Sequence, residues 1–145
     1  MKIYEIVTNR KKFMPLLILA DEQESMIDRY INLGKMYVLE DDGIKGECII
    51  TDEGGGIAEI KNLAVNSNFH RQGYGRAMIE FVAKKYSARN SLLQVGTGSL
   101  TVPFYEKCGF TKARVVKNFF VDNYDHPIYE DGHQLIDMIY LQRKL

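Results

Sequence analysis

A chain of 145 residues has the length of one domain, and we expect residues 1–145 to form a single one. Hydrophobic residues make up 46% of the sequence and charged residues 26%, a balance that excludes an intrinsically disordered chain. The 19 basic and 19 acidic residues cancel, and no long basic run occurs, which argues against a dedicated nucleic-acid-binding protein.

The cysteines, the histidines and one apolar run indicate the cellular compartment and whether the protein has a disulfide, a metal site or a membrane segment. Cys48 and Cys108 show no Cys-x-x-Cys spacing, which favours two free thiols in a reducing compartment over a disulfide. The three histidines have no standard metal-ligand spacing. The apolar run at 14–20 follows Lys11-Lys12 but is too short to cross a membrane and lacks a small-x-small cleavage site. We therefore expect a cytoplasmic protein without a membrane segment or a metal site.

The first half of the chain reads as a strand, two helical segments and a three-stranded meander. We expect strands at residues 2–7, 35–40, 45–51 and 57–65, and helices at residues 10–20 and 21–33. Asp21 could cap the second helix, with Glu24 three residues on as in a capping box, and Gly34 would end it. Asp41-Asp42-Gly43 and Gly54-Gly55-Gly56 are the turns between the meander strands.

The second half alternates between helices and strands. We expect helices at residues 74–89 and 103–108, and strands at residues 91–95, 111–120 and 134–142. An apolar stripe with helical spacing supports the first helix and consists of Ile79, Val82, Ala83 and Tyr86. Gly96-Thr97-Gly98 should break the strand at 91–95, and Pro103 suits a first helical turn. The helix at 74–89 connects neighbouring strands, which should therefore be parallel.

A glycine turn at residues 70–76 lies between the strand at 57–65 and the helix at 74–89. A helix N-terminus after such a turn presents free amides and a positive dipole end, which suit a phosphate or pyrophosphate. No Gly-Lys-Ser/Thr occurs, so the Walker A motif is absent. The dinucleotide fingerprint G-x-G-x-x-G fails at its third glycine, where Met78 stands. A third pattern, [Gln/Arg]-x-x-Gly-x-[Gly/Ala], matches His70-Arg71-Gln72-Gly73-Tyr74-Gly75 except at His70.

That third pattern resembles the turn of the GCN5-related N-acetyltransferase (GNAT) superfamily, and two further segments extend the resemblance. Ile60 to Val65, ending in Leu-Ala-Val, resembles the family's fourth strand, and Phe104 to Phe110 resembles its Tyr-Glu-Lys-x-Gly-Phe signature. The element order agrees from residue 2 to residue 143. The resemblance implies an α/β (α+β) fold, with a mixed, mostly antiparallel sheet of about seven strands, four flanking helices, and a central parallel pair that splays. It makes residues 1–145 one acetyltransferase domain.

Acetyl-CoA is the ligand that this resemblance implies. Backbone amides from Arg71 to Arg76 would hold the pyrophosphate, and the pantetheine arm would lie between the strands at 57–65 and 91–95. The Val65 amide would face the thioester carbonyl as an oxyanion-hole donor. The implied cofactor-binding set is Leu63, Ala64, Val65, His70, Arg71, Gln72, Gly73, Tyr74, Gly75, Arg76 and Tyr105.

The implied reaction is direct acetyl transfer to a primary amine of a small molecule or protein. Tyr105 is the candidate acid that protonates the leaving thiolate, although it could instead be a core tyrosine. A phenol and a thiol differ by roughly 1.5 pKa units, or about 2 kcal/mol, which a hydrogen bond could offset. Glu59 matches the catalytic glutamate of histone-type relatives and is the candidate base; a charged residue on a solvated strand face, or a water relay, are the alternatives. Cys108 has no evident partner histidine, which favours a packed cysteine over an acyl-enzyme.

The acceptor side is the least defined by sequence. Residues 118–142 contain no Lys or Arg but carry five acidic residues and several aromatic ones. This segment could form an acidic, aromatic rim for a cationic amine, or it could be a solvated loop. A non-catalytic acyl-CoA-binding or regulatory domain is the alternative function, and the retained Tyr105 favours the enzyme. Dimers are common in the family, so a homodimer is a further possibility.

Overall fold

The computed structural model describes all 145 residues. The strands are β1 (Lys2–Ile6), β2 (Lys35–Glu40), β3 (Ile44–Gly54), β4 (Ile57–Val65), β5 (Leu92–Thr97), β6 (Thr111–Val116), β7 (Ile128–Glu130), β8 (His133–Leu135) and β9 (Met138–Lys144). The α-helices are α1 (Met14–Ala20), α2 (Glu24–Ile27), α3 (Tyr74–Tyr86), α4 (Val102–Lys107) and α5 (Phe119–Asn123). Short 3-10 helices cover Arg10–Phe13, Ser67–Phe69 and Ser99–Thr101. No helix is long and apolar enough to span a bilayer.

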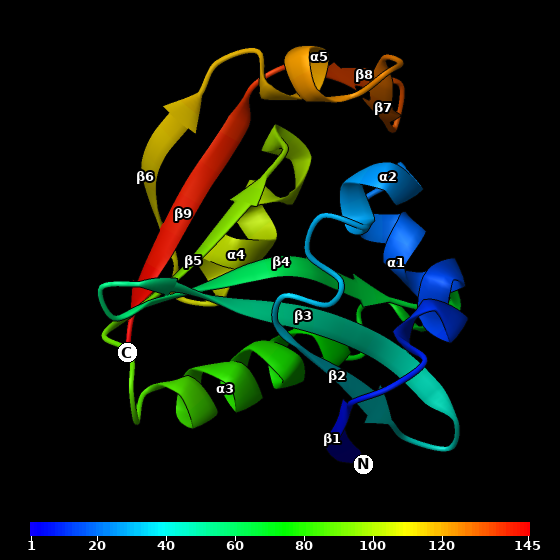
Figure 1. Ribbon diagram of the computed structural model, residues 1–145, viewed down its shortest axis with the longest axis vertical. Coiled ribbons are helices and arrows are strands. Elements are labelled where there is room, and N and C mark those ends of the chain that lie inside the picture. Colours follow the sequence, from blue (N-terminus) through cyan, green and yellow to red (C-terminus); the bar gives the residue numbers. More distant parts are fainter.

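Seven strands form one mixed sheet in the order β1-β2-β3-β4-β5-β9-β6, which confirms the predicted sheet. Only β4 and β5 are parallel, as expected for strands joined by the crossover helix α3. They pair only from Ile57 with Leu92 to Ile60 with Val95. Beyond Ile60 the two strands separate, and the sheet divides into two arms (Figure 1). The predicted splay is therefore present, and it opens next to the start of α3.

Helices cover both faces of this sheet. The helix α3 packs against one face, and α1 and α2 lie against the other (Figure 1). A core of 14 buried residues joins the sheet to α3 and α4, and a second core of seven joins it to α1 and α2. The stripe predicted for α3 supplies Ile79, Val82 and Ala83 as buried residues. Burying each larger apolar side chain is worth roughly 1.5–3 kcal/mol, so the two cores fix the strands around the splay.

The prediction of a helix over residues 21–33 is wrong. The helix α2 covers only Glu24–Ile27, and its N-cap is Gln23 rather than Asp21. Asp21 instead ends α1, where its carboxylate accepts hydrogen bonds from the hydroxyls of Tyr30 (2.9 Å) and Tyr124 (2.6 Å). The Asp21 carboxylate therefore accepts hydrogen bonds from two phenols instead of capping α2, and these bonds satisfy it where it is partly buried.

The prediction of one long strand at 111–120 is also wrong. The strand β6 ends at Val116, and the chain turns into α5, a fifth helix where four were expected. Asn118 adopts a left-handed backbone conformation (φ 59°) and donates its N–H to the carboxylate of Asp137. Phe120 then packs with Ile128 and Leu135 in a small separate core.

The expected strand at 134–142 is interrupted. Its first part, β8, pairs with β7 in a two-stranded hairpin, and only β9 joins the main sheet. The hairpin turn is Asp131-Gly132, with φ of 48° and 78°, the two positive values of a type I′ turn. Asp-Gly is a strong hairpin signal, so the sequence contained the information for this turn. The strand β5 also runs one residue past Gly96, the expected break, and ends at Thr97.

Candidate active site

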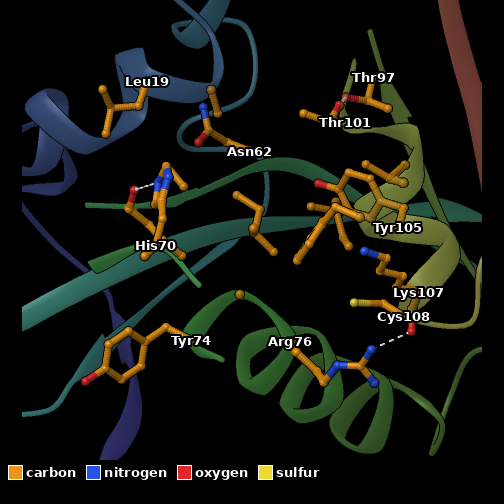
Figure 2. Close-up of a pocket in the computed structure, with 18 of the residues that line it drawn as sticks. Leu19, Asn62, His70, Tyr74, Arg76, Thr97, Thr101, Tyr105, Lys107 and Cys108 are labelled. Atoms are coloured by element: carbon orange, nitrogen blue, oxygen red, sulfur yellow. Dashed lines mark hydrogen bonds between the residues drawn. The ribbon is translucent and has the colours of Figure 1, made fainter. Parts of the chain in front are cut away.

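The splay between β4 and β5 opens a cavity of about 720 Å³. Its walls come from the ends of these strands, the loop before α3, the first turn of α3, and α4 (Figure 2). Ten of the sequence-predicted cofactor residues line it: Leu63, Ala64, Val65, His70, Arg71, Gly73, Tyr74, Gly75, Arg76 and Tyr105. Gln72 is the one predicted cofactor residue outside the lining. The cavity therefore brings together two motifs that are separate in the sequence.

The loop between β4 and α3 is held by short-range hydrogen bonds. The carboxamide oxygen of Asn66 accepts the N–H of Asn68, and the His70 ring bonds to the carbonyl oxygen of Val65 at 2.9 Å (Figure 2). A carbonyl can only accept, so the Nε2 of His70 carries the proton in this contact. His70 is the departure from the family motif, and here it fastens the loop to the end of β4.

The start of α3 is built to receive an anion. Gly73 is the N-cap in a left-handed conformation (φ 86°), and no side chain caps the helix. No acidic residue occurs in the first turn, while Arg71 and Arg76 line the cavity. Uncapped amides at the N-terminus of a 13-residue helix, in a lining that includes two arginines, suit a pyrophosphate. The Arg76 guanidinium also donates to the carbonyl oxygen of Lys107 (2.6 Å, Figure 2). The structure thus fits the ligand group that the motif implies.

Tyr105 faces the cavity from α4. The residue is only 6% exposed, yet no protein hydrogen bond engages its hydroxyl, which points into the cavity (Figure 2). Its ring packs edge-on against Phe104 and Phe110. Burial raises the pKa of Tyr105 well above the usual value of a phenol. The hydroxyl is therefore protonated at neutral pH and free to donate a hydrogen bond to a ligand atom.

Cys108 lines the same cavity one helical turn further on. Burial raises the pKa of its thiol, and no histidine is hydrogen-bonded to it. A thiol that stays protonated is a poor nucleophile. This environment suits the packed cysteine expected from the sequence.

Glu59 lies outside the cavity lining. Its side chain is buried, and it accepts a hydrogen bond from the carboxamide of Gln94 (2.6 Å) and forms an ion pair with Lys61 (2.8 Å). The alternative of a solvated strand face does not describe this residue, which is 4% exposed. The structure does not place Glu59 beside Tyr105 in the cavity, and its role as the base stays a prediction.

A second cavity of about 150 Å³ adjoins the first, and six residues line both: Leu19, Ala20, Lys61, Gly96, Thr97 and Glu130. Its remaining walls come from the α1–α2 link, α5, β7 and β8. The acidic and aromatic lining consists of Asp21, Glu22, Glu130, Phe120, Tyr124 and Tyr129. The segment after β6 thus contributes to a cavity wall, although among its five acidic residues only Glu130 does so.

Most charges around this second cavity are already paired. Asp21 accepts its two phenolic hydrogen bonds, and Glu22 contacts His126 at 3.1 Å. Lys61 is bound to Glu59. Glu130 alone among the charged lining residues has no ion pair or side-chain hydrogen bond, and its burial raises its pKa, with the Asp131 and Glu22 charges adding to the effect. No group of three or more His, Cys, Asp and Glu side chains is arranged to hold a metal.

The sequence placed the segment after residue 117 at a possible acidic, aromatic rim, but it gave no signal that Asp21 and Glu22 of the α1–α2 link line the same cavity. The contact between Tyr124 and Asp21 joins residues 103 positions apart, and no local pattern signals it. Glu130 belongs to the segment expected as a rim, and the Asp-Gly turn signal further places it at a hairpin tip.

Comparisons with known proteins agree with the site geometry. A family model described as an acetyltransferase (GNAT) domain matches residues 32–112. A GNAT family acetyltransferase from Elizabethkingia anophelis, solved with acetyl-CoA bound, is 33% identical, with a TM-score of 0.93 over 99% of this chain and 97% of that one. A Bacillus subtilis acetyltransferase in complex with CoA is 27% identical, with a TM-score of 0.89 over 99% and 98% of the two chains.

A curated relative supports the same assignment. It is the uncharacterized N-acetyltransferase YvbK of Bacillus subtilis strain 168, 29% identical over 131 residues, which are 87% of this chain and 84% of that protein. The glycine turn, the splayed strands and the relatives with bound CoA lead to one conclusion. The chain belongs to the GNAT family of acetyltransferases and is an acyltransferase that uses acetyl-CoA as its cosubstrate.

Proposed function

We propose that this enzyme transfers the acetyl group of acetyl-CoA directly to a primary amine of a small molecule, with a preference for cationic amines. The carrying observation is the second cavity, which adjoins the first cavity and is walled by aromatic and acidic side chains. An acidic, aromatic wall attracts an alkylammonium by charge and by cation–π contact. A protein amine is the alternative acceptor, and it would have to reach the same cavity.

The donor is proposed to bind along the first cavity. Amides at the start of α3 would hold the pyrophosphate, with Arg71 and Arg76 adding positive charge. The pantetheine arm would run between β4 and β5, and the N–H of Val65 would face the thioester carbonyl. Gly75 lets the start of α3 approach α4 closely, because a Cβ there would lie 2.9 Å from the ring of Phe104.

Tyr105 is proposed as the acid for the leaving thiolate. Its raised pKa keeps the phenol protonated, so the proton is available when the C–S bond breaks. Burial also disfavours the anionic thiolate, so desolvation raises both pKa values and leaves their difference smaller than the phenol shift alone suggests. A hydrogen bond from the free hydroxyl to sulfur would stabilise the developing charge.

Thiol release from acetyl-CoA over a panel of amines tests the function. We expect turnover with polyamines and aminoglycosides to exceed turnover with neutral amines of similar size. Equal rates for charged and neutral amines would rule out the cation preference. Tight CoA binding without thiol release for any amine would instead support a non-catalytic acyl-CoA-binding domain.

A matched pair of variants tests the acid. We expect Tyr105→Phe to lower kcat by about 100-fold or more, as for loss of a general acid, with CoA affinity retained. Tyr86→Phe removes a phenol outside both cavities, which is hydrogen-bonded to Tyr37, and should leave kcat near the wild-type value. Equal kcat for wild type and Tyr105→Phe would remove Tyr105 from the mechanism.

A further inference from the structure

Glu130 occupies the boundary between the two cavities. It lines both of them, from the tip of the β7–β8 hairpin. An acceptor in the second cavity must pass this boundary to bring its nitrogen to a thioester in the first. Glu130 is therefore next to the path of the reacting amine.

The hairpin holds this side chain in a defined place. Glu130 is paired with His133 across the turn, whose two residues both adopt the left-handed conformation of a type I′ turn. Below the turn, Ile128 and Leu135 are buried with Phe120. A short, packed hairpin is more rigid than an open loop, so it fixes the position of the Glu130 carboxylate at the cavity boundary.

The charges around Glu130 leave its carboxylate available. Asp21 and Glu22 line the second cavity, but neither is free. Two tyrosine hydroxyls donate to Asp21, and His126 contacts Glu22. Lys61 lines both cavities, but its ammonium is bound to the buried carboxylate of Glu59. The pairing of Lys61 also keeps Glu59 from acting as a free base.

We propose that Glu130 is the catalytic base of this enzyme, and that it binds the ammonium of the acceptor and takes its proton at the junction of the two cavities. This inference rests on the proposed function, since it assigns a residue to the same amine acceptor. It moves the role predicted for Glu59 to a carboxylate that lines the site.

The proton balance assigns one proton to each residue. The ammonium transfers its first proton to a carboxylate oxygen of Glu130, which passes it to water. The neutral nitrogen attacks the thioester carbonyl carbon, the C–N bond forms, and the C–S bond breaks. The nitrogen then loses its second proton to solvent, while sulfur receives one from Tyr105, which solvent reprotonates. Half-burial and the neighbouring charges of Asp131 and Glu22 raise the pKa of Glu130, which brings its basicity closer to that of the amine.

The primary test is the pH profile of kcat/KM for the best amine. We expect Glu130→Gln to lower kcat/KM by about 100-fold or more and to weaken the rise of kcat/KM on the acidic side of the profile. Glu130→Asp should recover part of the rate. Asp131→Asn is the matched control, because it removes a charge from the same turn while Asn tolerates the left-handed conformation, and Asp131 lines neither cavity. It should keep the acidic limb and the rate above it, with the limb displaced toward lower pH because the Asp131 charge raises the pKa of Glu130.

Two results would overturn the proposal. One is a Glu130→Gln enzyme with wild-type kcat/KM and an unchanged acidic limb. The other is loss of that limb in Glu59→Gln alone, which would make Glu59 the base. Unchanged thermal unfolding and CoA affinity in Glu130→Gln would exclude a merely structural effect.

A binding measurement separates this inference from the proposed function. Calorimetric titration of CoA-saturated protein with putrescine should show binding that Glu130→Gln weakens by about tenfold or more, as expected for loss of a charged partner. If the wild type binds putrescine through Glu130 but acetylates no amine, the proposed function fails and Glu130 remains the ammonium site. If amines are acetylated but Glu130→Gln behaves as wild type, only the inference fails.

Discussion

Gly73 and Gly75 stand in one turn but lack side chains for different physical reasons. Gly73 has a φ of 86° and open space around its Cβ position, so its constraint is conformational. Gly75 has an ordinary φ, but a Cβ there would lie 2.9 Å from the ring of Phe104. The two glycines of the motif therefore encode a backbone conformation and a close approach of α3 to α4.

These two constraints predict different rescue behaviour. Gly73→Ala should cost about 1–2 kcal/mol for a left-handed residue. Gly75→Ala should cost about 1–3 kcal/mol through overpacking, and the additional change Phe104→Leu should recover much of this cost. Urea denaturation of the single and double variants measures it. Equal recovery of Gly73→Ala by Phe104→Leu would contradict the distinction.

His70 offers a second prediction at this scale. Its ring donates to the carbonyl of Val65 and fastens the loop that lines the first cavity, where we propose that CoA binds. Loss of one such bond is worth about 0.5–1.5 kcal/mol, so His70→Ala should weaken CoA binding by about twofold to tenfold. His70→Gln introduces the family's residue, whose carboxamide can also donate, and should bind CoA more tightly than His70→Ala. Equal affinity of the two variants in calorimetric titration would show that the hydrogen bond does not hold the site.

At the scale of elements, the segment from α5 to β7 is attached to the α1–α2 link mainly by polar contacts. The Tyr124 hydroxyl donates to Asp21, the amide of Asp125 donates to the side chain of Gln23 (3.0 Å), and His126 contacts Glu22. These contacts close the second cavity between two segments of which neither belongs to the main sheet. The attachment should therefore respond to solution conditions more readily than the core does.

His126 makes this attachment dependent on pH. Hydrogen bonds to Asp125 and then to Glu22 raise its pKa above the ordinary value of 6.5. Only the Glu22 contribution depends on docking, because Asp125 lies on the same segment as His126. That contribution stabilises the docked state below the undocked pKa of His126 and is lost as pH rises through the docked pKa. Amide exchange in residues 118–137, corrected for intrinsic rates, should therefore show more protection at pH 6 than at pH 8.5.

Variants of two histidines check this origin. His126→Asn should reduce the difference between the two pH values, whereas His133→Asn, at an exposed position on β8, should preserve it. Protection that depends on pH equally in the wild type and in His126→Asn would mean that another group controls the attachment.

The elements that sequence predicts well are those with local signals. The hairpin at Asp41-Asp42-Gly43 and the stripe of α3 are read directly from turn chemistry and helical periodicity. The prediction of a helix at 21–33 is wrong because Asp21 is hydrogen-bonded to Tyr124, a residue distant in sequence, and no local rule predicts that contact. The first cavity was largely predictable because a motif marks its walls, while the second cavity depends on long-range packing that leaves no motif.

At the scale of the whole molecule, one buried carboxyl group in the central sheet makes the stability of the fold depend on pH. Glu47 lies on β3 opposite Ala64 and is fully buried; no side chain is hydrogen-bonded to its carboxylate, and the backbone of Ala64 is its polar neighbour. Burial raises the pKa of Glu47 well above its usual value. An ionised carboxylate without a side-chain partner would be very costly there, so the folded protein retains this proton where the unfolded chain releases it.

The sign of the pH dependence follows from this difference in bound protons. The contribution of Glu47 to stability is fully present below about pH 4.5 and is lost as pH rises toward its folded-state pKa. Between these two pKa values, the free energy of unfolding of the wild type should fall by up to about 1.4 kcal/mol per pH unit relative to that of Glu47→Gln, which has no proton to release. Urea denaturation of both proteins from pH 5 to pH 8, at constant high salt, measures the difference.

Glu106→Gln is the matched control, because it makes the same change at an exposed position on α4. Its stability relative to the wild type should vary much less with pH. If the free-energy difference between the wild type and Glu47→Gln stays constant from pH 5 to pH 8, Glu47 does not hold a proton in the folded state. A carboxylate at the centre of the sheet would then have to be stabilised by a partner other than the protein's own side chains, such as a buried water molecule.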